Sequence, residues 1–140
     1  MVDPLETVAR LRRLALDEAK EALATCLRAE AEAAGALAAL HAAIAAETSA
    51  AIAGADDRAV DAFGVWLRRT TDERAVAEAA LARAEARTAE ARAVLAASRG
   101  NKQAVQDLLL RRATDQAARE SRGEQAVLDE ANVTKWMTER

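Results

Sequence analysis

The fold is decided by residues 60–95, which read VDAFGVWLRRTTDERAVAEAALARAEARTAEARAVL. Mostly apolar or small residues recur there at alternating steps of three and four. These positions are Val60, Phe63, Leu67, Thr70, Arg74, Ala77, Leu81, Ala84, Thr88, Ala91 and Leu95. Such a seven-residue repeat is typical of a coiled-coil helix. Because one helix cannot bury its own apolar stripe, the sequence predicts that a second helix packs against it.

The same frame continues without a skip to Met137, but its chemistry changes on the way. The further positions are Ser98, Lys102, Val105, Leu109, Arg112, Gln116, Arg119, Gly123, Ala126, Glu130, Val133 and Met137. The stripe is apolar at Val105 and Leu109 and then turns polar. We expect the first part to meet a helix of this chain and the last part to need another protein.

The composition excludes a wide globular core. The chain has 140 residues, of which 40 are alanine, and its aromatic residues are Phe63, Trp66 and Trp136. A single proline and an abundance of Ala, Glu, Arg and Leu fit the class of long helices. Alanine has the highest helix propensity and lets two helices approach closely.

The charges are interspersed, with 20 basic and 23 acidic residues and a formal net charge of −3. Without a basic block, no nucleic-acid partner is expected. The single cysteine, Cys26, excludes an internal disulfide and suits a reducing compartment. No uncharged apolar run reaches the length of a membrane span, and the N-terminus lacks the order of a signal peptide. We therefore expect a soluble, cytoplasmic protein without direct membrane insertion.

Boundary signals predict two helices. Asp3-Pro4-Leu5-Glu6 combines a capping residue with proline at the first helical position, so the first helix is expected at about 4–53. The predicted turn is at about 54–57, where Gly54 can take the left-handed conformation that ends a helix. Asp56 or Asp57 then caps a second helix at about 58–136. In the first helix the apolar frame is expected to slip between Leu11 and Leu16.

A short connection between long helices makes them antiparallel. The expected layers are Ile44 with Leu67, Leu23 with Thr88, and Leu16 with Leu95. The predicted fold class is therefore all-α, with residues 1–140 forming a single antiparallel coiled-coil hairpin. Its second helix overhangs beyond Asp107 by roughly 50 Å. The alternative is a kink at residues 100–101 that redirects the rest of the chain.

The sequence offers little for catalysis. His41 is the only histidine and lies about four helical turns from Cys26, so we expect neither a metal site nor a thiol–base pair. The glycines form no phosphate-binding loop. Carboxylates on an open helix lack a pocket that would shift their pKa values. We predict no enzyme activity, no cofactor and no metal.

A leucine triplet at residues 108–110, followed by Arg111 and Arg112, points to binding instead. Only one of the three leucines can face the first helix. Either all three pack around Leu5, Val8 and Leu11, or they form an apolar patch ringed by arginines. Such a patch suits an acidic or apolar partner surface.

The tip of the hairpin is a second candidate. Phe63 and Trp66 are three residues apart near the predicted turn. Phe63 is expected in the seam, whereas Trp66 lies one position off it and could anchor another protein.

Three segments carry a family resemblance. Residues 4–11 read PLETVARL, residues 110–116 read LRRATDQ, and residues 120–131 contain ESR and then EQAVLDEA. The first resembles the opening helix, and the others the C-terminal run, of the flagellar FliJ family, a small coiled-coil component of type III protein export. The arrangement of two long predicted helices resembles that of the family over the full length of the chain. The sequence departs from the family at Ala43 and Glu47, where members often carry tyrosine. Injectisome stalk proteins share this layout and stay open as an alternative.

The resemblance implies a fold similar to the central stalk of rotary ATPases and a non-enzymatic role as a stalk and coupling protein. The end with both termini would bind the hexameric flagellar export ATPase through Leu5, Val8, Leu11, Arg12, Leu109, Arg112 and Asp115. The region near the turn would bind the membrane export-gate protein through Leu37, Leu40, Ile44, Phe63, Trp66 and Thr70.

Export chaperones are further implied partners, and the implied location is the cytoplasmic face of the membrane-bound export apparatus. The alternative function is that of a generic coiled-coil adaptor or chaperone that dimerises through its C-terminal overhang.

Overall fold

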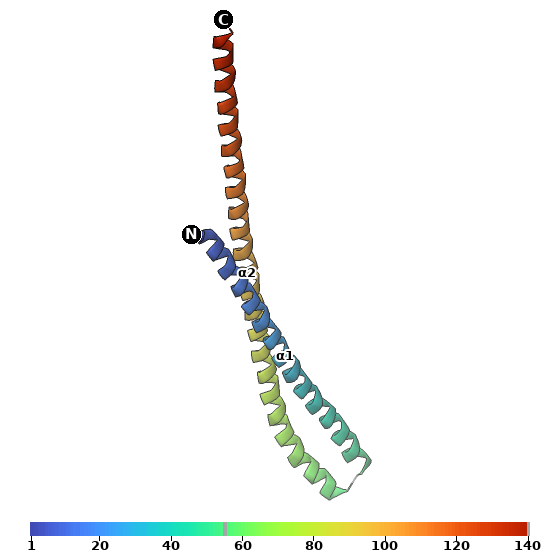
Figure 1. Cartoon of the computed structure of the whole chain (residues 1–140). Helices are drawn as coiled ribbons and strands as arrows, with labels where there is room; N and C mark the ends of the chain where they lie inside the picture. Colours follow the sequence, from blue (N-terminus) through green and yellow to red (C-terminus); the bar gives the residue numbers. More distant parts are fainter. Residues whose placement is uncertain (55, 140) are drawn as a thin grey trace. The chain divides into compact units, whose positions relative to one another are not determined.

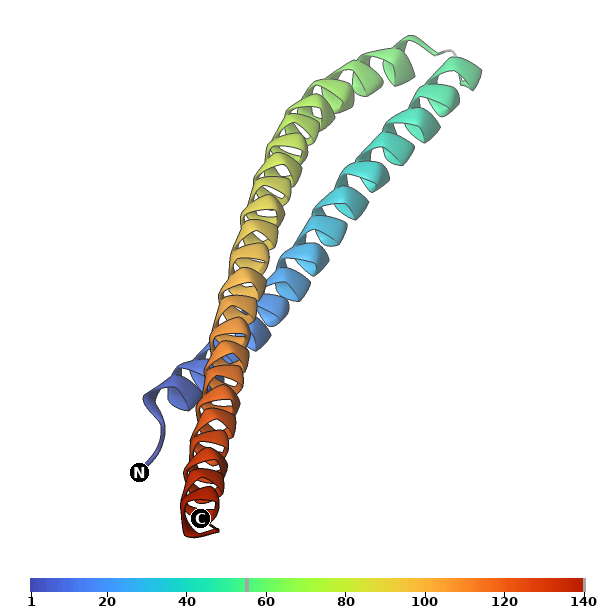
Figure 2. The same cartoon turned by 90° about the horizontal axis from the view of Figure 1, so that it is seen from above.

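The structure, a computed structural model, describes residues 1–54 and 56–139 and consists of two long helices (Figure 1, Figure 2). Helix α1 spans Pro4–Ala53 and helix α2 spans Asp57–Thr138. The described residues contain no strand. The two helices pack against each other, which confirms the predicted all-α class.

The chain divides into two compact units, which are described separately. The hairpin unit is Leu16–Ser98, and the terminal unit combines Met1–Ala15 with Arg99–Arg140. Helical conformation continues through Gly100 and Asn101, so α2 is one helix across the position where the alternative placed a kink. A single hairpin domain over residues 1–140 stays a prediction.

Aspartate side chains start both helices, as the sequence predicts. The backbone amide of Leu5 donates a hydrogen bond of 3.0 Å to Asp3 Oδ1, and the amide of Arg58 donates one of 3.1 Å to Asp56 Oδ1. Each carboxylate satisfies one of the amides that a helix leaves without an internal partner. Pro4 needs no such partner because it has no N–H group.

Helix α1 ends without the left-handed glycine conformation that the sequence permits. None of the described glycines, Gly54 included, has a positive φ. Instead, the Gly54 amide donates a hydrogen bond of 3.0 Å to the carbonyl oxygen of Ala50, adding one more helical bond after Ala53. The predicted turn includes Ala55, which lies outside the described residues.

Burial in the hairpin unit follows the predicted frame. On α2 the buried or half-buried frame positions are Phe63, Leu67, Thr70, Arg74, Ala77, Leu81, Ala84, Thr88, Ala91, Leu95 and Ser98. On α1 they are Leu16, Ala19, Leu23, Cys26, Glu30, Ala33, Leu37, Leu40 and Ile44, followed by Thr48 and Ala51. Only Val60, the first predicted position on α2, is exposed, at 53%. The spacing of apolar residues thus identified the contact face of both helices.

The best-packed part of the hairpin is a cluster of Leu16, Ala19 and Leu95, with Leu23 beside it. This cluster confirms the predicted Leu16–Leu95 layer. Near the turn, residues 47–51 of α1 lie across from residues 59–66 of α2, so the helices run antiparallel. Figure 1 shows this reversal between the cyan end of α1 and the green start of α2.

At two frame positions of α2 the buried residue is a threonine and not an apolar residue. Thr70 is 4% exposed and Thr88 is fully buried. The Thr88 hydroxyl donates a hydrogen bond of 3.1 Å to the carbonyl oxygen of Ala84 in the preceding turn. Because this bond stays within one helix, a buried hydroxyl is satisfied without a partner on α1.

Helix α1 contains a stretch that is long and apolar enough to cross a membrane, with a mean hydropathy of 1.5. None of this stretch is buried, and it lies near the N-terminus. Length and composition alone are weak evidence for a membrane span, because the core helix of a soluble protein and a signal sequence meet the same criterion.

Replacing Leu16 by alanine should lower the free energy of unfolding by about 2–4 kcal/mol, because it removes a buried leucine side chain from the cluster. Leu14→Ala is the matched control, since Leu14 is 53% exposed and should change stability by roughly 0.5 kcal/mol or less. Urea unfolding followed by far-UV circular dichroism measures both. Equal losses for the two variants would contradict the observed frame.

Candidate protein-binding surfaces

An ion pair joins the two helices in the terminal unit. Nη1 of Arg112 donates hydrogen bonds to both carboxylate oxygens of Asp3, at 2.9 Å to Oδ1 and 2.7 Å to Oδ2. Asp3 therefore caps α1 and holds α2 at the same time. The pKa of the Asp3 carboxyl is lowered from 3.8, first by the Leu5 amide and then by the Arg112 guanidinium.

Next to this pair lies an open cleft of about 580 Å³, called the terminal cleft below. Its lining residues are Leu5, Leu108, Arg111, Arg112, Asp115, Gln116 and Arg119. Two leucines provide apolar surface and three arginines provide positive charge. A partner with an apolar side chain flanked by carboxylates would complement this surface.

The structure brings together only part of the predicted ATPase-binding set. Leu5, Arg112 and Asp115 line the terminal cleft. Leu109 is half-buried, whereas Val8, Leu11 and Arg12 are exposed and do not line the cleft. Leu108 and Arg111 also line the cleft and belong to the leucine and arginine patch that the sequence indicates for binding, whereas Gln116 and Arg119 were not predicted. The sequence signal for Gln116 and Arg119 is weak, because they join the cleft only where the start of α1 approaches α2.

The leucine triplet does not close around α1. Leu109 is half-buried in the frame, but Leu108 is 51% and Leu110 is 68% exposed. Leu11 is 59% exposed as well, so the packing alternative for the triplet is wrong. Near the start of α1, Leu5, Ala9 and Ala15 are half-buried while Leu11, Arg12 and Leu14 are exposed, so the expected slip of the frame between Leu11 and Leu16 stays a prediction. The terminal unit thus exposes several large apolar side chains.

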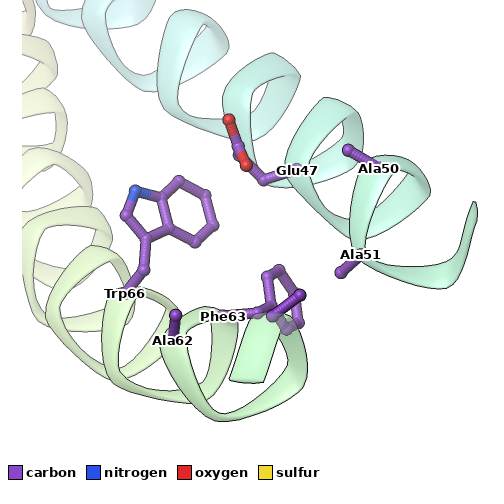
Figure 3. A pocket seen from close by; sticks show the side chains of 7 residues that line it. Glu47, Ala50, Ala51, Ala62, Phe63 and Trp66 are labelled. Carbon is purple, nitrogen blue, oxygen red and sulfur yellow. The ribbon is translucent and has the colours of Figure 1, made fainter. Parts of the chain in front are cut away.

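A second hollow, called the tip crevice below, lies between α1 and α2 next to the turn and has a volume of about 340 Å³. It is lined by Glu47, Ala50, Ala51, Ala59, Ala62, Phe63 and Trp66. Figure 3 shows the rings of Phe63 and Trp66 projecting from α2 towards α1. The two rings stack with centroids 5.9 Å apart and an angle of 27° between their planes. Small alanines around two large rings leave the crevice open.

The residues predicted for the export gate lie mainly in the seam. Leu37, Leu40 and Ile44 are half-buried against α2, and Thr70 is only 4% exposed. Of the predicted set, only Phe63 and Trp66 line the tip crevice. The sequence did not identify Glu47 or the four alanines as lining residues. Glu47 is the only charged side chain in the lining.

No group of three or more His, Cys, Asp or Glu residues within 1–54 and 56–139 could hold a metal ion. Cys26 is a half-buried free thiol in the seam, and His41 is exposed.

These features define a class of protein: an all-α hairpin whose candidate sites are open surfaces on its helices. A family model described as flagellar FliJ protein matches residues 1–140, so the chain belongs to the FliJ family. No match is found among curated proteins or among solved structures. The family is a cytoplasmic, non-catalytic component of flagellar protein export, which implies an export-related role for this chain.

The ion pair of the terminal unit predicts a pH dependence with a definite sign. A carboxyl group whose pKa is lower in the folded state stabilises that state above its ordinary pKa. The contribution is lost as the pH falls through the folded-state value, so the terminal unit should loosen in acid below pH 3.8. An NMR titration of Asp3 should give a pKa below 3.8.

Arg112→Gln should move that pKa only part of the way back, because the hydrogen bond from the Leu5 amide, the larger cause, remains. The neighbouring change Arg111→Gln is the control and should leave the Asp3 pKa unchanged. A titration curve that is identical in the wild type and in Arg112→Gln would show that the ion pair does not form in solution.

Proposed function

We propose that this chain is a non-enzymatic stalk and coupling protein of the flagellar export apparatus. The terminal unit binds the hexameric export ATPase, and the tip of the hairpin unit binds the cytoplasmic part of the membrane export-gate protein. The observation that carries the proposal is the terminal cleft, where leucines and arginines from both helices meet in a protein whose family works in flagellar export.

The terminal unit is suited to a ring of subunits because its two helices differ. Residues 5–14 of α1 expose Val8, Leu11 and Leu14, while α2 exposes Leu108 and Leu110 next to arginines. Such a surface cannot make the same contacts with every subunit of a symmetric hexamer. Unequal contacts would favour some subunit conformations over others and so bias assembly and turnover of the ATPase.

The tip crevice supports the second contact. A tryptophan and a phenylalanine provide a large apolar surface with little conformational entropy to lose, which is typical of residues that anchor an interface. Glu47 at the edge of the crevice adds one negative charge that can orient a basic partner group.

Assistance to export chaperones and a position at the cytoplasmic face of the membrane-bound apparatus complete the proposal. Both rest on the family and on the proposed gate contact, and the described surfaces add no separate argument for them.

Adding the chain to the flagellar export ATPase should change its rate of ATP hydrolysis or the fraction of hexamers. Arg111→Glu should weaken this effect by roughly tenfold in the concentration required, because it reverses a charge in the terminal cleft without removing the Asp3–Arg112 ion pair. ATPase assays and size-exclusion chromatography measure the two effects.

Arg92→Glu is the matched control, since Arg92 is an exposed arginine of the hairpin unit. It should act like the wild type. The proposal fails if the wild-type chain alters neither hydrolysis nor hexamer formation.

The gate contact can be followed with Trp66. In a Trp136→Phe background, Trp66 is the sole tryptophan, and its emission should shift to shorter wavelength when the cytoplasmic part of the gate protein is added. Trp66→Ala should weaken binding by about tenfold or more, as expected for an anchor residue. Trp136→Ala, at the other end of α2, is the control. Unchanged emission together with unchanged affinity of Trp66→Ala would exclude the tip as the gate contact.

A further inference from the structure

The C-terminal part of α2 carries a helical seam that nothing in the described chain covers. From Leu110 to Glu139 every residue is exposed, although the helix continues to Thr138. The seam residues Val133 and Met137 are 57% and 67% exposed, and Val127, which flanks the seam, is 66% exposed. We propose that a second copy of this chain covers the seam, forming an antiparallel two-helix coiled coil over residues 112–137.

The first argument is that the seam positions of two copies can pair with one another in a single register. In an antiparallel coiled coil, each layer pairs one seam residue with one from the other helix. One register pairs all eight seam positions with each other. Its layers are Arg112 with Met137, Gln116 with Val133, Arg119 with Glu130, and Gly123 with Ala126. A two-fold axis between residues 124 and 125 repeats each layer, as an isologous dimer requires.

The charges select this orientation. Arg119 lies opposite Glu130 of the second copy, and the flanking Arg122 lies near Asp129 of the second copy. A parallel pair in register would instead place Arg119 against Arg119 and Glu130 against Glu130. In the part of the chain that the structure describes, the side chains of Arg119 and Glu130 form no ion pair or hydrogen bond. Their charges are therefore available for a partner, and like-charge contacts exclude the parallel form.

Gly123, next to the two-fold axis, is explained by the same arrangement. Glycine disfavours the interior of a helix, and its φ here is not positive. A Cβ atom at Gly123 would meet nothing within 4 Å, so no neighbour in the described chain requires a glycine. Opposite Ala126 of a second copy, however, the missing side chain permits a close approach of the two backbones.

The terminal cleft fits the ends of this dimer. The register places Val133 of the second copy at Gln116 and Met137 of the second copy at Arg112, and both Gln116 and Arg112 line the cleft beside Leu5 and Leu108. Apolar side chains of one copy thus enter the apolar part of the cleft of the other. If the cleft also binds the export ATPase, a step that rests on the proposed function, dimerisation and ATPase binding exclude each other.

Small and polar layers make such a dimer weak and reversible, with a dissociation constant on the order of micromolar. Sedimentation velocity of the full chain without any ATPase should therefore show a monomer that becomes a dimer as the concentration rises. Arg119→Glu and Glu130→Arg should each weaken self-association by about tenfold or more, because each creates two like-charge layers.

The double variant R119E/E130R should recover dimerisation, since it exchanges the charges and keeps their pairing. An equimolar mixture of the two single variants should form a heterodimer. At positions 119 and 130 the R119E variant has two acidic side chains, and the E130R variant has two basic ones. In the mixed pair, both of these layers therefore join an acidic side chain to a basic one. Far-UV circular dichroism should show unchanged helicity for all variants.

Orientation is tested by disulfide formation in a Cys26→Ser background. Gln116→Cys mixed with Val133→Cys should form a cross-linked pair, whereas neither variant alone should cross-link to itself. A chain that stays monomeric at all concentrations, charge variants that associate like the wild type, or self-cross-linking of Gln116→Cys would each overturn the proposal. Because no ATPase is present, these results leave the proposed stalk function standing.

Discussion

The hairpin depends on one constraint. The frame positions of α1 and of α2 recur at alternating steps of three and four residues, and the two helices must pack so that each frame position of one lies opposite a frame position of the other. Each layer is small, because alanine fills many of the positions and only a few, such as Leu16 and Leu95, contribute large side chains. Stability therefore accumulates along the length of the helices and not in a central core. A hairpin of this kind tolerates Thr88, whose hydroxyl is satisfied within α2. It also accepts Arg74, whose Nε lies 3.7 Å from Glu78 Oε1 but is buried and has no hydrogen-bond partner among the described residues.

The two helices have unequal lengths, 50 residues in α1 and 82 in α2, and this has a physical consequence. Since every layer takes a residue from each helix, part of α2 cannot be paired within the chain. Starting a helix is costly, but extending one that already exists is not. Hydrogen bonds between side chains four residues apart, such as Gln116 to Glu120 and Gln125 to Asp129, add local support. The unpaired part can therefore stay helical and keep its seam available to other molecules.

Much of the fold was predictable because its signals are local. The frame in residues 63–109 and the caps at Asp3 and Asp56 depend on residues close in sequence. The start of α1 was misread because Leu11 and Leu14 are large and apolar, yet they are exposed while small Ala9 is half-buried. Hydrophobicity predicts burial only where a partner surface exists. The sequence also leaves the conformation of Gly54 open, because a glycine permits the left-handed region without requiring it.

The candidate sites were harder to predict than the fold, for a different reason. The terminal cleft needs Leu5 to approach Leu108 and Arg119, which are more than a hundred residues away in the sequence, so periodicity within one helix cannot define it. In the hairpin unit, the apolar residues that look like anchors, such as Leu37 and Leu40, are the ones that hold the helices together. A side chain cannot serve fully in both roles, because burial in the seam removes the surface that a partner would contact. On a two-helix protein, surface that a partner could contact is therefore left where pairing is incomplete, at the tip beside Trp66 and where α2 continues without α1.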